Sequence, residues 1–345
     1  IQRFYLRRMK MTTELQIRMP DAPKKGLVFA LLLDGQGGAT PLTMDEVEQW
    51  KEEDGFLWLH FDSSAQETKD YMLEKSGIQA LVLDSLLDDE EDRPRCMSFG
   101  DNLMLFLRAI NLNVGEEPDD MISLRMWEEK KRLITLREDP MGFMWEIKQH
   151  LAIGAGPRDA GEMLDEICSL TLDKIVEAVS DIENYIDRAE DEILDEIEDE
   201  ELMPRLSEIR RNLTEMRRYL APQRDAMEGV SRQMLSWMSG KDRFFLHENA
   251  NRMLRIIEDI DSLRERAMIN IDELANKVRE QTQQNMNTLS VLAAIFIPLN
   301  FVTGLFGMNV GGIPGQNMAG FTFAVVSLIT VGFILALIFK RLKWY

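Results

Sequence analysis

The sequence predicts an α+β membrane protein, in which an α/β domain is followed by long helices and two C-terminal transmembrane helices. Three observations predict this class. Strand and helix patterns alternate over the first half, the second half is helical, and residues 289–339 contain no Asp, Glu, Lys, Arg or His. The 345 residues carry 40 Lys and Arg against 60 Asp and Glu, a net charge of −20. A chain this acidic lacks the basic face of a general nucleic-acid binder.

The α/β domain is expected over residues 1–155. Thr43 with Glu46 three positions on is typical of a capping box at a helix start. A glycine- and proline-containing segment at 154–161 marks the end of the domain. Runs rich in β-branched and aromatic residues predict five strands, at Leu27–Leu33, Phe56–Phe61, Leu103–Leu112, Ile122–Trp127 and Arg132–Arg137.

Acidic flanking helices are expected over residues 156–242. Residues 162–201 hold 17 acidic side chains against Lys174 and Arg188 alone. Two interpretations stay open: a solvated helix face, or a surface that raises the cation concentration near a pore mouth. Pro204 predicts that this helix ends at about Met203.

A second flanking helix is expected to follow, up to about Ser239. Gly240 is expected to end it as a C-cap, and Asp242 is expected to be the N-cap of the next helix.

A stalk helix is expected over residues 243–288, because apolar residues recur there with alternating spacings of four and three. This repeat of 3.5 residues is typical of coiled coils and helix rings. It favours a homo-oligomer whose stalks pack side by side and continue unbroken into the first membrane span. The members of this apolar stripe are Leu246, Ala250, Met253, Ile257, Ile260, Ala267, Ile271, Leu274 and Val278.

Two transmembrane helices are expected at 289–306 and 321–339, each roughly 27–29 Å long at helical rise, close to the thickness of the bilayer core. A glycine-rich outer loop at 307–320 separates them, and a basic tail at 340–345 follows. Lys and Arg directly after the second span predict a cytoplasmic C-terminus, and two spans then place the N-terminal body in the cytoplasm too. The first ten residues, IQRFYLRRMK, are too polar for the apolar core of a signal peptide.

No catalytic pattern stands out, so the chain is not expected to be an enzyme or to carry a cofactor. His60, His150 and His247 are isolated, and no metalloprotease, nucleophile-elbow or phosphate-loop motif is present. Cys96 and Cys168 lie 72 positions apart, which excludes a CxxC redox motif and a closed zinc site built on one.

A line of small and polar residues runs along the first span with the same four–three spacing. Polar groups within a membrane are costly unless they face a bundle interior or a wet cavity, so the line predicts a pore wall. Tight helix packing through small residues, with Asn300 as a hydrogen-bond donor, is the alternative. This polar line consists of Gln283, Met286, Ser290, Ala293, Ile297, Asn300 and Gly304.

Gly307-Met308-Asn309 follows the first span directly, and the second span ends in Lys340-Arg341-Leu342-Lys343-Trp344. This arrangement resembles the CorA superfamily of divalent-cation transporters over essentially the whole chain. The outer loop lacks acidic residues and reads Val310-Gly311-Gly312-Ile313-Pro314-Gly315. Together with Leu32–Ala39 near the start, this loop most resembles the ZntB zinc-transporter branch of the superfamily.

The resemblance implies a funnel-shaped homopentamer in a bacterial inner membrane, with zinc as the transported substrate and uptake coupled to a proton gradient. Lipid, divalent cations and further copies of the chain would be its partners. Gly307, Met308 and Asn309 would form the pore entrance, where Asn309 receives the hydrated metal ion. Five neutral amides bind an ion weakly enough to release it. A CorA-type magnesium and cobalt channel, and a membrane-anchored scaffold or sensor, are the alternatives.

The sequence limits how protons could be coupled to transport. Residues 289–339 contain no charged side chain or histidine that could relay protons across the membrane. Asp272, Glu273 and Glu280 lie within about 17 residues of the first span. Repeated in five chains, they would form an acidic ring that takes up protons because its like charges repel. Two routes for coupling stay open: protons cross as water-borne ions through the same wet pore, or protonation acts on this cytoplasmic ring.

Overall fold

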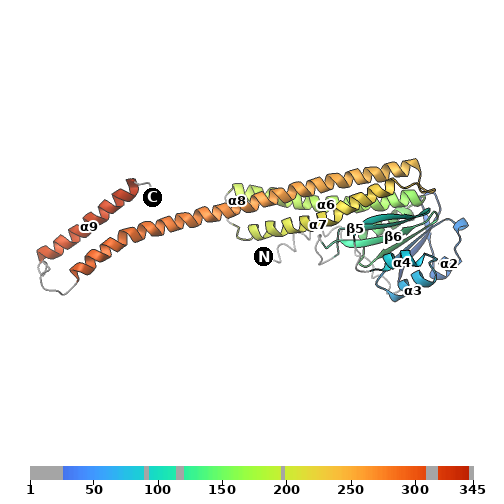
Figure 1. The fold of residues 1–345 in the computed structure, drawn as a ribbon, viewed down its shortest axis with the longest axis horizontal. Coiled ribbons are helices and arrows are strands. Elements are labelled where there is room, and N and C mark those ends of the chain that lie inside the picture. Colours follow the sequence, from blue (N-terminus) through green and yellow to red (C-terminus); the bar gives the residue numbers. More distant parts are fainter. Residues whose placement is uncertain (1–25, 89–92, 114–119, 196–198, 308–317, 342–345) are drawn as a thin grey trace. The chain divides into compact units, whose positions relative to one another are not determined.

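Figure 1 shows the computed structural model of the chain, which describes residues 26–88, 93–113, 120–195, 199–307 and 318–341. The chain divides into two compact units, Ile1–Asn270 and Ile271–Tyr345. Helix α8 (Gly240–Phe306) contributes to both. Each unit is therefore treated by itself below.

The core of the first unit is a seven-stranded sheet with the order β2-β1-β3-β7-β6-β5-β4. β3 and β7 pair in parallel, and every other neighbouring pair is antiparallel. All five predicted strands are present, and β2 and β4 are two that the sequence patterns miss. The strands are β1 (Leu27–Leu33), β2 (Ala39–Pro41), β3 (Phe56–Asp62), β4 (Arg95–Phe99), β5 (Asn102–Ala109), β6 (Ile122–Glu128) and β7 (Arg132–Arg137).

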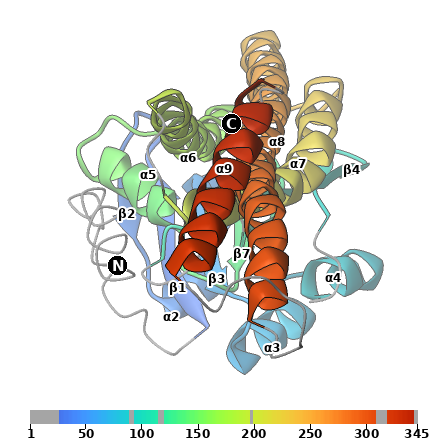
Figure 2. The same cartoon turned by 90° about the vertical axis from the view of Figure 1, so that its left-hand side faces the viewer.

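Short helices cover one face of the sheet: α2 (Met44–Gln49), α3 (Gln66–Glu74) and α4 (Ala80–Leu87) (Figure 2). The predicted capping box starts α2, since the Glu46 carboxylate accepts from the Thr43 backbone N–H at 2.7 Å. Because strand side chains alternate, Leu57, Leu59 and Phe61 of β3 all face these helices and are fully buried among them.

The other face of the sheet packs on α5 (Gly142–Ala152) and on two long helices, α6 (Ala160–Leu194) and α7 (Leu202–Ser231). Phe29 of β1 stacks on His60 and meets Trp145 of α5 with its ring centroid 6.3 Å away. Thr135 connects strands here, because its hydroxyl lies 2.8 Å from His60 Nδ1 and accepts from Trp58 Nε1 at 3.0 Å. Burial, and then the charge of Arg137, lowers the pKa of His60 to about 3, so this histidine is neutral.

Within the first unit, α6, α7 and α8 lie side by side (Figure 1). α8 runs parallel to α6. Asn249 donates to Asp165 at 2.8 Å, and Arg266, later in α8, donates to Glu190, later in α6, at 3.0 Å. On the other side, Arg217 of α7 donates to Asp261 of α8.

These contacts correct the expectation for the apolar stripe. Its members from Leu246 to Ala267 are buried inside a single chain, against α6 and α7, and not against other stalks. Beyond the end of the first unit, Ile271 and Leu274 are only half-buried and Val278 is 60% exposed. Only this last part of the stripe is open to another chain.

The helix ends also differ from the expectation. α6 ends at Leu194, well before Met203, and Pro204 lies in the first turn of α7, where a missing N–H costs no helical hydrogen bond. α7 ends at Ser231 instead of about Ser239.

The start of α8 is capped differently from the prediction too. Gly240 begins α8 and does not end α7. Ser239 is the capping residue, because the Asp242 N–H donates to its hydroxyl at 3.2 Å and the Ser239 N–H donates to the Asp242 carboxylate at 2.7 Å. Asp242 is therefore the third residue of the helix, the N3 partner in a capping box with Ser239, and not the N-cap.

The second unit contains the continuation of α8 and helix α9 (Met318–Arg341). A Cβ added at Gly332 of α9 would lie 4.0 Å from Leu299 Cδ1 of α8, which is an ordinary packing distance. Among the described residues, α8 is the one helix long and apolar enough to cross a membrane, and the apolar stretch found in α9, Phe321–Leu335, is shorter. The second span therefore stays a prediction.

Glu128, the last residue of β6, is a buried acid at the interface between the sheet and α6. Its side chain is 1% exposed, and neither carboxyl oxygen has a hydrogen-bond partner among the residues that the structure describes. Burial, assisted by the nearby charge of Asp159, raises the pKa of Glu128 well above its ordinary value. Glu128 is thus held in its neutral form in the folded protein.

This burial predicts a pH dependence of stability. Unfolded Glu128 loses its proton above about pH 4.5 while the folded protein keeps it, so the free energy of unfolding falls by about 1.4 kcal/mol per pH unit until the folded pKa is reached. Glu128→Gln should remove this slope. Denaturant unfolding of the detergent-solubilised chain at pH 5, 6 and 7 measures it.

The matched control is Glu138→Gln, which removes an exposed carboxylate just after β7. Its stability should follow the wild-type pH dependence. Parallel pH curves for wild type and Glu128→Gln would mean that Glu128 is ionised in the folded state.

Candidate functional site

The candidate site is the second half of α8, where the polar line was predicted. This segment is continuous helix through Pro298 to Phe306, so the four–three spacing keeps the members of the line near one face. In the single chain every member is exposed: Gln283, Met286, Ser290, Ala293, Ile297, Asn300 and Gly304. Their shared role as a pore wall stays a prediction.

Several polar groups of this segment are already hydrogen-bonded within the helix. Ser290 Oγ donates to the Met286 carbonyl at 2.8 Å, and Gln283 Nε2 donates to Asn287 Oδ1 at 2.9 Å. The first bond goes back to the backbone of the preceding turn and the second goes to a side chain of the next turn, so both donors are satisfied within α8. The face is therefore polar without requiring a second helix to satisfy these groups.

The predicted pore entrance is only partly within the described residues. Gly307 directly follows α8. Its N–H donates to the Thr303 carbonyl at 2.9 Å, so the helical hydrogen-bond pattern extends to Gly307. Met308 and Asn309 lie outside the residues that the structure describes.

The three acids of the predicted ring are all exposed on α8, but helical geometry does not bring them to one line. Asp272 falls within about 20° of Gln283 around the helix axis, in register with the polar line. Glu273 and Glu280 lie about 80–100° around the helix from Asp272. The structure therefore groups Glu273 with Glu280 and leaves Asp272 on the face that carries the polar line.

No three His, Cys, Asp or Glu side chains gather closely enough to hold a metal ion within the described ranges. The two cysteines are single thiols in this structure, and burial raises the pKa of Cys96 to about 11. At neutral pH this thiol is protonated, which is the form that binds metal poorly.

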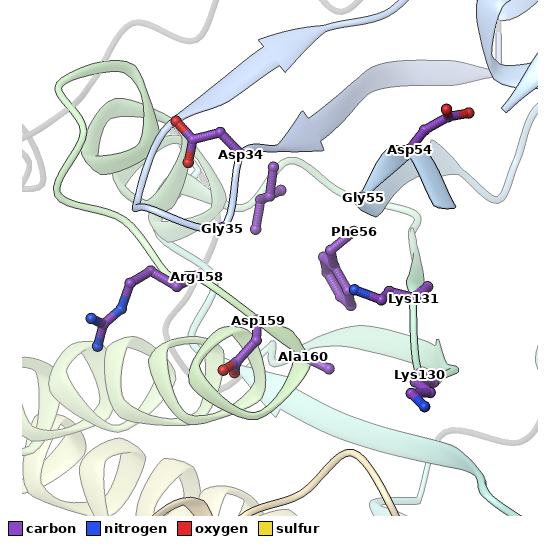
Figure 3. A pocket seen from close by; sticks show the side chains of 11 residues that line it. Asp34, Gly35, Asp54, Gly55, Phe56, Lys130, Lys131, Arg158, Asp159 and Ala160 are labelled. Atoms are coloured by element: carbon purple, nitrogen blue, oxygen red, sulfur yellow. The ribbon is translucent and has the colours of Figure 1, made fainter. Parts of the chain in front are cut away.

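A cavity of about 220 Å³ opens at one end of the sheet, away from any residue singled out as a site by the sequence (Figure 3). Its walls come from the β1–β2 turn, the residues before β3, the β6–β7 turn and the start of α6. The lining mixes both signs of charge: Asp34, Asp54 and Asp159 with Lys130, Lys131 and Arg158.

Two of these charged groups are already engaged in the structure. Asp34 Oδ1 accepts from the backbone N–H groups of Gln36 and Gly38, at 2.7 and 2.9 Å, which holds this segment in a turn. Arg158 pairs with Glu162. The cavity therefore offers no excess of one charge to recruit an ion.

The contacts that fix α8 were missed from sequence. Arg266 binds both Glu190 and Asp187 of α6, and these contacts raise the pKa of its guanidinium. Asn249 and Asn270 are buried polar residues that donate to carboxylates of α6. The signal was present as polar residues within an apolar repeat, but sequence does not reveal their partners.

Comparison with known proteins gives matches over nearly the whole chain. The model of the family described as "CorA-like Mg2+ transporter protein" matches residues 53–341. The divalent cation transporter CmaX of Pseudomonas aeruginosa is 33% identical over 329 residues, covering 93% of this chain and 97% of that protein. The zinc transport protein ZntB of Klebsiella pneumoniae is 34% identical over 335 residues, covering 96% and 98%.

Solved structures agree with this assignment of the fold. The structure of full-length CmaX superposes with a TM-score of 0.81 at 32% identity, and covers 94% of this chain and 100% of that one. The CorA magnesium transporter of Methanocaldococcus jannaschii superposes with a TM-score of 0.77 at 21% identity, covering 92% and 98%. At that lower identity the likeness concerns the fold alone.

Proposed function

Because the chain belongs to the CorA-like Mg2+ transporter family, we propose that it transports divalent cations, zinc first, across a bacterial inner membrane. The observation that carries the proposal is similarity along nearly the full length to relatives named as zinc or divalent-cation transporters. Members of this family are ion transporters and not enzymes. The acid-free outer loop supports zinc, as in the ZntB branch.

The ion path is assigned to the polar line of α8. One helix cannot enclose a path, so several copies have to surround it, and the family resemblance supports a funnel-shaped homopentamer. The exposed apolar residues of α8 support an assembly as well, since large apolar side chains left in water mark contact surfaces. In the first unit these are Phe244, Phe245, Leu254, Met268 and Ile269.

At the outer end of the path, Asn309 supplies a ring of neutral amide oxygens. Such a ring holds a hydrated cation loosely and lets it pass on, whereas a ring of five carboxylates would retain it. The second span at 321–339 then returns the chain to the cytoplasm, so that both termini lie on that side.

Magnesium is the second candidate substrate, favoured by the description of the matching family. Oxygen ligands alone separate magnesium from zinc weakly, because affinity for such sites follows geometry and metal availability. A side-by-side measurement of zinc and magnesium flux into vesicles decides between them.

Zinc flux into vesicles that contain the purified chain should depend on Asn309. Asn309→Ala removes the amide from every subunit at once and should lower the flux at least about tenfold, with the assembly intact by size analysis. Gln316→Ala, which removes another amide from the same outer loop, serves as the control and should transport normally. Normal flux through an assembled Asn309→Ala protein would remove Asn309 from the pore entrance.

The apolar stripe predicts two different outcomes along its length. Val278→Asp places a charge on an exposed position of the stripe, so the protomer should fold normally while the oligomer dissociates on size analysis. Ile257→Asp buries the same charge inside the protomer and should prevent folding, as measured by circular dichroism. An intact oligomer in Val278→Asp would mean that this part of the stripe faces lipid or water.

Proton coupling is assigned to the acids near the membrane, because the spans lack groups that could relay protons. Replacing Asp272 with Asn and both Glu273 and Glu280 with Gln should remove the response of zinc flux to an imposed pH gradient. The measurement is flux at equal zinc and varied external pH. An unchanged response in the triple variant excludes these carboxylates, and a wild-type flux indifferent to pH excludes coupling.

A further inference from the structure

The polar line continues below the point where the predicted pore wall begins. Stepping back from Gln283 with the same four–three spacing reaches Arg279, Asn276 and Asp272, all within about 40° of Gln283 around the helix axis. All three are exposed on the single chain, and the helix is unbroken between them. An arginine thus lies on the face assigned to a cation path.

The contacts of Arg279 keep its charge on that face. Its guanidinium donates to Asn276 Oδ1, one turn back on the same line, at 3.0 Å. Within the part of the chain that the structure describes, Arg279 forms no ion pair with a carboxylate. The charge is therefore not cancelled by a neighbour on its own helix.

We propose that Arg279 is a specificity-determining residue whose positive charges form an electrostatic barrier at the cytoplasmic end of the ion path. The proposal rests on the proposed function, since five copies of α8 have to surround the path. A ring of fixed charges in a pore selects by charge, and a cationic ring disfavours cations. Arg279 makes cation passage slower than a neutral side chain at the same position would allow.

The neighbouring residues give the barrier a defined place. Asp272 lies seven residues earlier on the line, about 10 Å along the helix axis, and Gln283 lies about 6 Å further on. A cation on the path therefore meets an amide, then a guanidinium, then a second amide and a carboxylate. A cation attracted to Asp272 is separated from the membrane part of the path by the ring of Arg279.

Lys277 provides a matched control for charge. It carries the same charge only two residues away, but it lies about 160° around the helix from Arg279 and so on the far side from the polar line. General surface electrostatics would treat the two residues alike, whereas a barrier on the path depends on Arg279 alone.

The experiment measures zinc flux into vesicles of neutral lipid that contain the full chain. At about 0.01 M salt, where charges act over about 30 Å, Arg279→Gln should increase the flux about tenfold, and at about 1 M salt the increase should largely vanish. Lys277→Gln and the charge-conserving Arg279→Lys should each stay within about twofold of wild type at both salt concentrations.

A flux in Arg279→Gln that equals or falls below that of Lys277→Gln overturns the barrier while leaving zinc transport established. Absence of both zinc and magnesium flux in the wild-type protein is a different result, which overturns the proposed function and the barrier with it. Should Arg279→Gln not assemble, wild-type flux decides alone: it must rise with salt, and a flux independent of salt overturns the barrier.

Discussion

The burial of one side of α8 against α6 and α7 determines which part of this helix is covered within the chain and which part is left for other partners. It holds from Leu246 to Ala267 and ends near Asn270, the last residue of the first unit. The helix does not end there, because its backbone hydrogen bonds are internal and need no neighbour. From Ile271 onward the same side of the helix has lost its cover, and new partners have to come from lipid or from other chains.

Much of the fold can be predicted from local sequence patterns. The patterns do not show which strands pair or which helices pack together. The five predicted strands are long and apolar, whereas β2 has three residues and β4 is an edge strand whose Met97 and Ser98 are exposed. β2 is too short to show a pattern, and β4 is only partly buried, so its pattern is weak. The parallel pairing of β3 with β7 joins segments more than 70 residues apart. Likewise, the apolar stripe indicates that one side of the helix is buried, but the pattern does not show that α6 and α7 cover it.

For the candidate site, the four–three periodicity predicts which residues share one face of α8, and the family resemblance suggests that this face lines an ion path. The polar line could be read from the sequence because a membrane span makes polar residues conspicuous. On the cytoplasmic side of Gln283 charged residues are common, so Arg279 does not stand out in the sequence although it lies on the same face of the helix. Closeness in sequence places Asp272 and Glu273 in one predicted ring, but neighbours in a helix point about 100° apart.

The clamp of Arg266 on Asp187 and Glu190 has a consequence for α6 itself. These acids, with Asp191 and Glu192, lie near the C-terminal end of α6, where the aligned peptide dipoles already concentrate negative charge. Acidic side chains there weaken the last turns of a helix, and α6 has no basic residue in its final turn. Arg266 of α8 thus supplies, from another helix, the positive charge that α6 lacks in its own final turn, and separating the two helices would leave the end of α6 less stable.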